Sequence, residues 1–291
     1  MKPATRSRGR RMPGSRSLAV RMVLVAVLTP VLTLGLLGVV IALAPGRWMF
    51  GLILGLLVGL GVMIYKHSQG RQPAAGRLEE RDDPELFGLL NRLCALADMP
   101  LPEVVLSEES QPNTWVVHFP GRPPRLYITA GLRQALTREE LHAVLGHELA
   151  HIVNRDALVM TVVEWPGAIM RRVNGGAGLG GIFVAAIGAL SYLGVTMLSR
   201  YRELAADAGS CAIAGRPSAL ASALLKVSNS LEHIPQQDLR AAAALNAFNL
   251  VAVPPRSRLL RRVPLLARVV ATHPPLRARL DALEALERAQ Q

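Results

Sequence analysis

The sequence H-E-L-A-H at residues 147–151 decides how this chain folds, because it places two histidines on one face of a helix. His147 and His151 are about one helical turn apart, so both imidazoles can reach one Zn²⁺ ion. Glu148 is rotated by about 100° from His147, so its carboxylate can face water beside the metal and act as a general base. A chance match is the alternative, but two unliganded histidines on a buried helix face would need other polar partners.

The helix that carries this motif has a clear beginning. Thr137 and Glu140 form the T-x-x-E pattern of a capping box, in which each side chain satisfies a free backbone N–H of the other residue. We predict a helix from this point to about Asn154.

A second acidic segment downstream offers a third ligand. A catalytic zinc site needs three protein ligands and an open fourth position. The segment S-R-Y-R-E-L-A-A-D at residues 199–207 places Glu203 and Asp207 four residues apart, on one helix face. We assign Glu203 to the metal and Asp207 to a position behind it, where a carboxylate would orient a ligand imidazole. A solvated, charged helix face is the alternative interpretation.

The composition indicates a membrane protein. Hydrophobic residues make up 51% of the 291 positions and the mean hydropathy is +0.29, which is high for a soluble enzyme. Met22–Ala44 is a 23-residue apolar run, and Trp48–Tyr65 follows after a Pro-Gly-Arg turn, so residues 18–66 are predicted to form a transmembrane hairpin. Residues 1–17 form a basic tail that we expect to be disordered.

Basic residues flank the hairpin on both sides, so we expect the N-terminus and the following domain to face the cytoplasm. The net charge of +12 could suggest nucleic-acid binding, but no aromatic residues are interleaved with the charges as stacking on bases would require. We therefore expect a lipid bilayer as partner and no nucleic acid.

The zinc hypothesis also constrains the segments between the two ligand helices. Two further apolar stretches, 157–170 and 179–198, separate His151 from Glu203. Because both ligands must meet at one ion, either both stretches cross the membrane or neither does. We favour a second transmembrane or membrane-associated hairpin within residues 157–199, although the first stretch is short and contains Glu164.

The remaining sequence predicts a mostly helical domain with a small antiparallel sheet, divided into residues 78–156 and 200–291. Asp83-Pro84 begins a helix, and Gly215 and Pro217 separate two later helices. A last helix is expected after Pro275. The expected strands are Val104–Leu106, Thr114–Phe119 and Leu126–Thr129.

Three motifs together resemble the HtpX-type membrane proteases, gluzincins related to the Ste24 and Oma1 peptidases. They are the H-E-x-x-H helix with Asn154 and Asp156 after it, S-R-x-R-E-x-x-A-D, and T-H-P-P-x-x-x-R at 272–279. The similarity covers nearly the whole chain from the first apolar hairpin onward. It implies a mostly α-helical integral-membrane protein with an α+β gluzincin domain. It also implies one Zn²⁺ per chain and a zinc endopeptidase of the inner membrane whose polypeptide substrates are misfolded or damaged membrane proteins.

The resemblance also implies two sets of supporting residues. His273 and Arg279 are candidates to stabilise the oxyanion, although a Pro-fixed turn with an acid-paired arginine is the structural alternative. Asn113, Trp115 and Val117 lie on a candidate edge strand that would receive substrate by β-augmentation, with a core strand as the alternative. The family's Asn-Ala-Phe appears here as Asn-Thr-Trp at 113–115, a departure in the substrate region.

Two other functions remain open at this point. A membrane scaffold that retains zinc without turnover would be expected to lack Glu148 or an open coordination position. A prenyl-protein-processing peptidase of the Ste24 kind would need more membrane spans than the four at most that this chain offers.

Overall fold

The computed structural model describes residues 16–43, 75–118, 123–157, 179–232 and 271–290, together with single residues between these ranges. The basic tail up to residue 15, nearly all of Trp48–Tyr65, and the link at 254–264 lie outside the described residues. The structure therefore bears on one helix of the predicted first hairpin and on both ligand helices.

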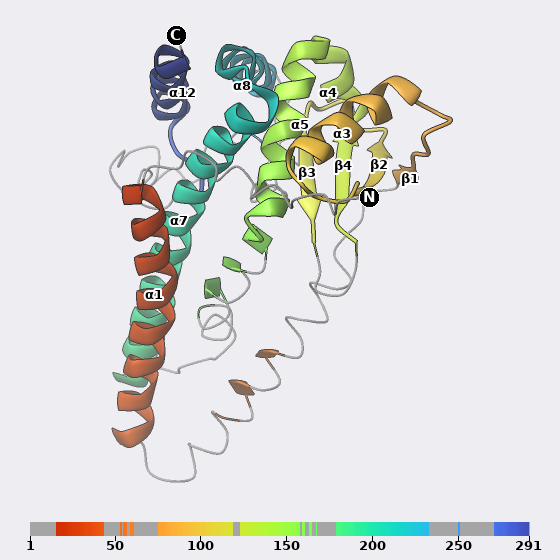
Figure 1. Ribbon diagram of the computed structural model, residues 1–291. Coiled ribbons are helices and arrows are strands. Elements are labelled where there is room, and N and C mark those ends of the chain that lie inside the picture. Colours follow the sequence, from red (N-terminus) through yellow and green to blue (C-terminus); the bar gives the residue numbers. More distant parts are fainter. Residues whose placement is uncertain are drawn as a thin grey trace, which may run out of the picture.

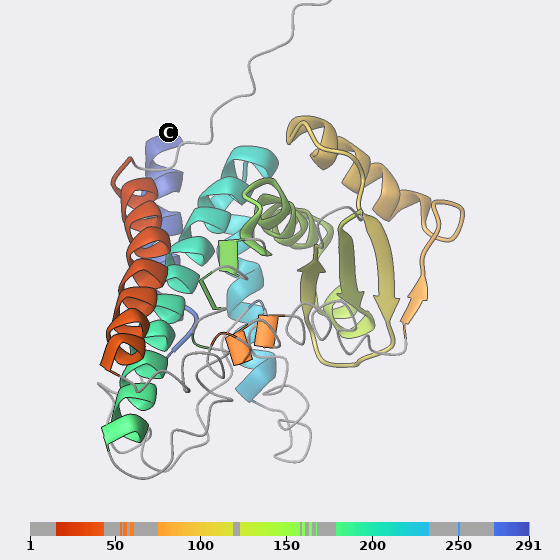
Figure 2. The same cartoon turned by 90° about the horizontal axis from the view of Figure 1, so that it is seen from below.

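Two long helices lie side by side and run antiparallel, α1 (Arg16–Leu43) and α7 (Leu179–Ala214) (Figures 1 and 2). Within the described residues, one helical stretch, Gly181–Ala214, is long and apolar enough to cross a membrane, and Val20–Leu36 is a shorter apolar helix. Helix α1 exposes a set of large apolar side chains: Val20, Val23, Leu24, Val27, Leu28, Val31, Leu32, Leu34 and Val39. Such a surface is typical of helices that face lipid.

Helix α7 is continuous through the point where the sequence suggested a division. It begins in the apolar stretch and carries Glu203 and Asp207 near its other end, without a break at residue 199. In the preceding stretch, described Val163 is buried against Val195 and Leu198 of α7. The described part of that stretch therefore packs beside the middle of α7.

A small sheet lies beside the ligand helices, as predicted, but it is mixed rather than antiparallel. Its strands are β1 (Ala75–Arg77), β2 (Glu103–Ser107), β3 (Thr114–Val117) and β4 (Arg125–Thr129), in the order β1-β2-β4-β3. The β3–β4 hairpin is antiparallel, but β4 takes the inner position next to β2, which has the same direction, so this pair is parallel. Strand β1 was not predicted, because it is only three residues long.

Helices α3 (Pro84–Leu96), α4 (Ala130–Ala135) and α5 (Arg138–Val153) complete this layer (Figure 1). The predicted capping residues are confirmed, because Asp83 Oδ1 accepts from Leu86 N at 3.0 Å and Thr137 and Glu140 form a capping box. The core between them is apolar and includes Leu90, Leu93, Leu126, Ile128, Leu132, Leu145 and Leu149. Burial of this core fixes α5 against the sheet.

The last two helices are α8 (Pro217–Glu232) and α12 (Leu276–Gln290), and both begin where the sequence predicted. Helix α8 is tied to the start of α5 through Glu140, whose carboxylate accepts from Ser222 Oγ at 2.6 Å and from Lys226 Nζ at 2.7 Å. Cys94 and Cys211 are both free and buried.

Candidate metal centre

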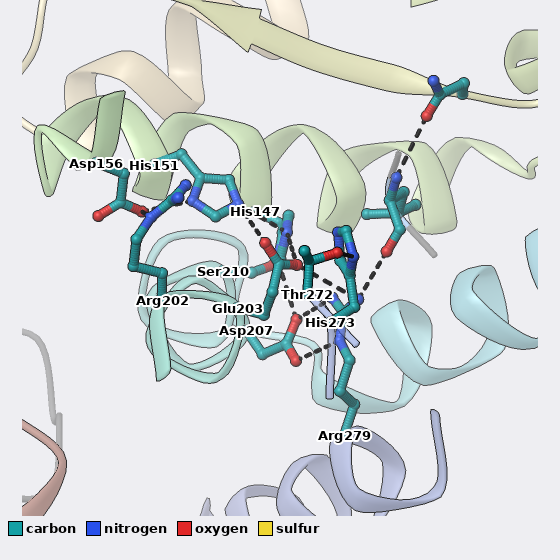
Figure 3. Close-up of polar contacts among 12 residues, drawn as sticks. His147, His151, Asp156, Arg202, Glu203, Asp207, Ser210, Thr272, His273 and Arg279 are labelled. Atoms are coloured by element: carbon teal, nitrogen blue, oxygen red, sulfur yellow. Dashed lines mark hydrogen bonds and ion pairs between the residues drawn. The ribbon is translucent and has the colours of Figure 1, made fainter. Parts of the chain in front are cut away.

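The three predicted ligands meet between α5 and α7 (Figure 3). One ligand atom from each of His147, His151 and Glu203 lies within 4.8 Å of the others. The two Nε2 atoms are 3.1 Å apart, and the Glu203 oxygens lie 3.6 Å from His147 Nε2 and 3.7 Å from His151 Nε2. Two histidines and one carboxylate are the ligand set of many catalytic zinc sites.

A carboxylate faces the other nitrogen of each imidazole. His147 Nδ1 lies 3.0 Å from Asp207 Oδ1, and His151 Nδ1 lies 2.6 Å from Asp156 Oδ2. A carboxylate can only accept, so it favours a proton on Nδ1 and leaves the lone pair on Nε2. Both imidazoles are therefore oriented for a shared electrophile, and the predicted position of Asp207 behind a ligand agrees with this geometry.

The arrangement fits a cation. With both protons on Nδ1, two Nε2 lone pairs would face each other at 3.1 Å, which is repulsive unless positive charge lies between them. Burial opposes a charge on His147, but its contacts with Asp207 and Glu203 outweigh burial and raise the pKa of His147 to about 9. The surroundings of the site thus favour positive charge.

Glu148 lies in the same buried region as the three ligands. Glu148 is only 4% exposed, and this burial is the main reason why the pKa of its carboxyl group is raised above the ordinary value. His147 and His151 oppose the shift, and Glu203 adds to it. A carboxyl group with a raised pKa is suited to take up and release a proton near neutral pH.

A chain of buried polar contacts links the site to the C-terminal helix and the sheet. Arg279 donates from Nε and Nη2 to both oxygens of Asp207, at 2.8 and 2.6 Å. It also donates from Nη1 to Leu250 O at 2.7 Å, and Leu250 N donates to Asn113 Oδ1 at 3.3 Å. Arg279 therefore braces the carboxylate behind His147, and one end of the brace reaches the residue that precedes β3.

His273 is also buried beside this cluster (Figure 3). Its Nδ1 lies 3.1 Å from Thr272 Oγ1. Burial lowers the pKa of His273 and so favours the neutral imidazole, although Glu203 has the opposite effect. The structure brings His273 and Arg279 to the site. The guanidinium of Arg279 is hydrogen-bonded to Asp207 and Leu250, and its Nη1 also lies 3.6 Å from Glu203 Oε2.

The close approach of α5 and α7 depends on Gly146, which precedes the first ligand. A Cβ at this position would lie 3.3 Å from both Ser210 Oγ and Ala214 Cβ. Ser210 Oγ donates to Ala143 O at 2.6 Å, so a side chain and a backbone carbonyl join the two helices directly. The roles of Gly146 and Ser210 were not predicted, because neither residue belongs to a metal-ligand pattern.

Asp156 and Arg202 are two further residues whose roles the sequence did not reveal. Arg155, just before Asp156, has a φ of 54°, and this left-handed turn after the end of α5 brings Asp156 back towards His151. Arg202 Nε lies 3.1 Å from Asp156 Oδ2, so the residue beside Glu203 contacts the carboxylate that orients His151. The sequence signal was Asp156 five residues after His151, but only the turn at Arg155 shows that it folds back.

The candidate substrate residues lie at the edge of the sheet. Among the described strands, β3 pairs only with β4. Trp115 is buried and stacks on Tyr127, with ring centroids 4.9 Å apart, while Val117 is partly exposed. Asn113 Oδ1 accepts from Leu250 N, and Asn113 O accepts from Thr129 Oγ1 at 3.0 Å. The Trp115 and Asn113 side chains thus pack within the protein, and the strand backbone is what lies at the edge.

Comparison with known proteins agrees with this geometry. Residues 80–287 match peptidase family M48. The chain is 37% identical over 295 residues to "Protease HtpX homolog 1" of Streptomyces coelicolor, and the match covers 94% of each chain. It is 36% identical to a "Protease HtpX homolog" of Moorella thermoacetica, with 81% of this chain and 84% of that protein covered.

A solved structure shares the fold at low sequence identity. The crystal structure of S. mikatae Ste24p matches with a TM-score of 0.52 and 15% identity. The match covers 92% of this chain but 66% of that chain, so the larger protein has additional structure. At this identity the likeness concerns the fold alone.

Proposed function

The chain belongs to peptidase family M48 as a homologue of the HtpX proteases, and from this membership we propose that it is a membrane-bound zinc endopeptidase that removes misfolded or damaged membrane proteins. The observation that carries the proposal is the buried group of His147, His151 and Glu203 with Glu148 beside it. These four side chains provide three ligands and one base, which hydrolysis of a peptide bond at a metal requires.

The three ligand side chains would hold one Zn²⁺, and two carboxylates would keep the imidazoles in place. Asp207 faces His147 and Asp156 faces His151, so each Nε2 points to the same centre. When bound, zinc supplies Lewis-acid chemistry for peptide hydrolysis. Arg279 would support this centre through Asp207, which it holds with two hydrogen bonds, and through Glu203, whose Oε2 lies 3.6 Å from its Nη1.

Glu148 would act as the general base. Its carboxylate takes a proton from the attacking water and passes this proton to the nitrogen of the leaving amine. The raised pKa of Glu148 suits both steps, because the protonated acid is then easier to form. His273 is the proposed donor to the oxyanion, because its imidazole lies in the cluster and is not bound to a carboxylate by any described hydrogen bond.

Substrate would bind as an extended strand along β3. Backbone hydrogen bonds at a sheet edge accept many sequences, which suits a protease that acts on unfolded chains. Residues 113–117 precede and form this strand, and Leu250 joins Asn113 to Arg279. The substrate strand would lie beside α5. Its position would be linked, through Asn113 and Leu250, to Arg279, which holds Asp207 behind His147.

Membrane anchorage is the second part of the proposal. Helices α1 and α7 would cross the bilayer, since both expose large apolar side chains, and their charged ends would lie in the cytoplasm of a multi-pass protein of the cell membrane. We propose the division into a hairpin at 18–66, a second membrane segment at 157–199, and protease parts at 78–156 and 200–291. Helix α7 is continuous across residue 199. The membrane segment at 157–199 and the protease part at 200–291 would therefore move as one rigid unit.

Two alternative functions are less well supported. A scaffold without turnover would not need a buried Glu148 beside the ligand set. Processing of prenylated proteins in an enclosed chamber would need the additional structure that the larger Ste24p chain has.

The decisive experiment uses the full chain in membranes. Wild type and Glu148→Gln would be incubated with an unfolded membrane substrate, with and without a chelator, and Glu139→Gln would serve as an exposed control on the same helix. We expect degradation by wild type and by Glu139→Gln only, and only without chelator. Equal degradation by wild type and Glu148→Gln would contradict the proposal.

A further inference from the structure

One helix carries both the apolar surface and a metal ligand. Helix α7 contains no charged residue from Leu179 to Ser199, and its first charge is Arg200. Glu203 follows three residues later on the same unbroken helix. The height of the metal centre relative to the membrane is therefore fixed by helix geometry.

The contact between α1 and α7 gives a common scale for both helices. A Cβ on Gly194 would lie 2.1 Å from Thr29 Oγ1, so the two helices approach closely at this point. The two helices are antiparallel, so a step towards the N-terminus on α1 matches a step towards the C-terminus on α7. The residue nine positions before Thr29 and the residue nine positions after Gly194 therefore lie at the same height along the shared helix axis. Those residues are Val20 and Glu203, each about 13 Å from the contact at 1.5 Å per residue.

Exposed side chains on both helices show how far the apolar surface reaches. On α7 the last exposed large apolar side chain is Met197, about 9 Å before Glu203 along the helix axis. On α1 the apolar surface extends to Val20, and the exposed cation Arg21 is beside it. On α7 the exposed apolar surface thus ends between Met197 and Glu203, and on α1 it reaches at least Val20. The charges near that height are arginines, which favour the headgroup region.

A second contact lies within the apolar region, on the membrane side of Glu203. After α5 ends, the chain enters a cluster in which Val163 packs with Val195 and Leu198, and Val159 and Met160 lie against it. Met22 of α1 belongs to this cluster as well. The described residues that follow α5 therefore pack in the apolar region beside Met22, Val25 and Ala26 of α1.

We propose that the metal centre lies at the membrane surface, within about 10 Å of the end of the apolar belt, and cuts substrates a few residues outside their own membrane spans. This inference rests on the proposed function, because it presumes a membrane-bound protease. It adds the distance between the metal centre and the end of the apolar belt. An extended chain advances at most about 3.6 Å per residue, so three residues cover that height. With two or three more residues bound in the site, about five or six residues would separate the span from the cut bond.

The test measures the shortest accessible spacer. Full-length protein with zinc is placed in liposomes together with reporter proteins that have one transmembrane helix and a cytoplasmic tail. The tail carries a sequence that the enzyme cuts in unfolded casein, placed after Gly-Ser spacers of about 2 to 20 residues, and mass spectrometry locates the cut. We expect cleavage to begin at a spacer of fewer than eight residues, because the site is close to the surface.

An onset at eight residues or more would overturn the inference, because it would place the site far from the membrane. The longest spacer separates this failure from failure of the proposed function. If the 20-residue reporter is cut by wild type and not by Glu148→Gln, the protease assignment stands whatever the onset. If no reporter is cut, both the protease assignment and the inference are wrong.

A measurement of depth tests the geometry without activity. A nitroxide on Val20→Cys reports the height of Glu203, and one on Val27→Cys serves as the control deep in the apolar belt; both side chains are exposed. Relaxation by oxygen and by a water-soluble nickel complex gives the depth of each label in liposomes. We expect Val20→Cys in the headgroup region and Val27→Cys in the hydrocarbon core. A Val20→Cys label in bulk water, well beyond the headgroups, would contradict the proposal.

Discussion

Arg279 and Asp207 form a two-pronged ion pair in the interior of the protein, with both side chains 2% exposed. Two N–H donors of one guanidinium meet the two oxygens of one carboxylate, the geometry in which such pairs are strongest. Because Asp207 Oδ1 also lies 3.0 Å from His147 Nδ1, the pair connects the C-terminal helix α12 to a metal ligand on α5. A C-terminal residue is thus part of the support of the metal centre.

Removing the arginine should cost both stability and metal affinity. Arg279→Met leaves Asp207 buried without its partner, and we expect the free energy of unfolding to fall by about 3–5 kcal/mol. Thermal unfolding in detergent, with and without zinc, measures the loss. The exposed neighbour Arg277→Met is the control and should change little. If both variants unfold alike, the brace has no energetic role.

The contact between Asp156 and His151 should contribute to zinc binding. Asp156→Asn keeps the size of the side chain but weakens the acceptor 2.6 Å from His151 Nδ1. We expect zinc affinity to fall about 10- to 100-fold, as for other partners of metal-bound histidines. Competition with a chromophoric chelator gives the affinity directly, without an activity assay. The exposed carboxylate variant Asp281→Asn should bind zinc like wild type, and an unchanged affinity in Asp156→Asn would show that the contact is dispensable.

The sequence predicted the metal ligands and Asp207 behind them, but not the contacts that Asp156, Arg202 and Arg279 make around them. Metal ligands follow from spacing on single helices, and the spacings of H-E-x-x-H and of Glu203 and Asp207 are local properties of the chain. The contacts of Arg279 and Arg202 join residues far apart in sequence, so no periodicity reveals them. The turn that returns Asp156 to His151 depends on the positive φ of Arg155. A positive φ is uncommon for a non-glycine residue, so the sequence does not predict this turn.

The fold shows the same division. Caps, helix ends and proline positions predicted α3, α5, α8 and α12, because each is set by a few neighbouring residues. The prediction of an antiparallel sheet was wrong, because the parallel pairing of β2 with β4 is a tertiary contact that the alternation of side chains along a strand does not reveal. The single long helix α7 was divided at residue 199 because its composition changes there while its backbone does not.

Acid should weaken the attachment of α8 to the metal-binding helix. Burial opposes ionisation of Glu140, but its bonds with Lys226, Ser222 and Thr137 outweigh burial and lower its pKa from 4.5 to about 2. A lowered pKa in the folded state stabilises the protein fully above pH 4.5, and this contribution is lost as the pH falls towards 2.

Glu140→Gln should therefore lose about 2 kcal/mol at neutral pH, a value reduced to allow for the partly exposed Lys226. It should also show a flatter dependence of stability on pH between 4.5 and 2 than wild type. Urea unfolding at several pH values in detergent checks this, with the exposed Glu139→Gln as control. Parallel curves for wild type and Glu140→Gln would exclude this contribution.

Substrate binding along β3 should depend on the backbone of the substrate. We expect a peptide with an N-methyl group at one residue beside the cut bond to be cleaved at least tenfold more slowly, because one hydrogen bond and the close approach of two strands are lost. A scan of N-methyl positions at constant side chains measures this. Equal rates at every position would mean that β3 does not bind the substrate backbone.

The central claim is that Glu148 acts as the base at a metal held by His147, His151 and Glu203. The most direct measurement compares zinc content and proteolysis of Glu148→Gln and wild type in the same membranes. We predict one zinc per chain in both proteins and a rate at least about 100-fold lower in the variant, because only proton transfer is removed. Full proteolysis by a zinc-loaded Glu148→Gln would contradict the account.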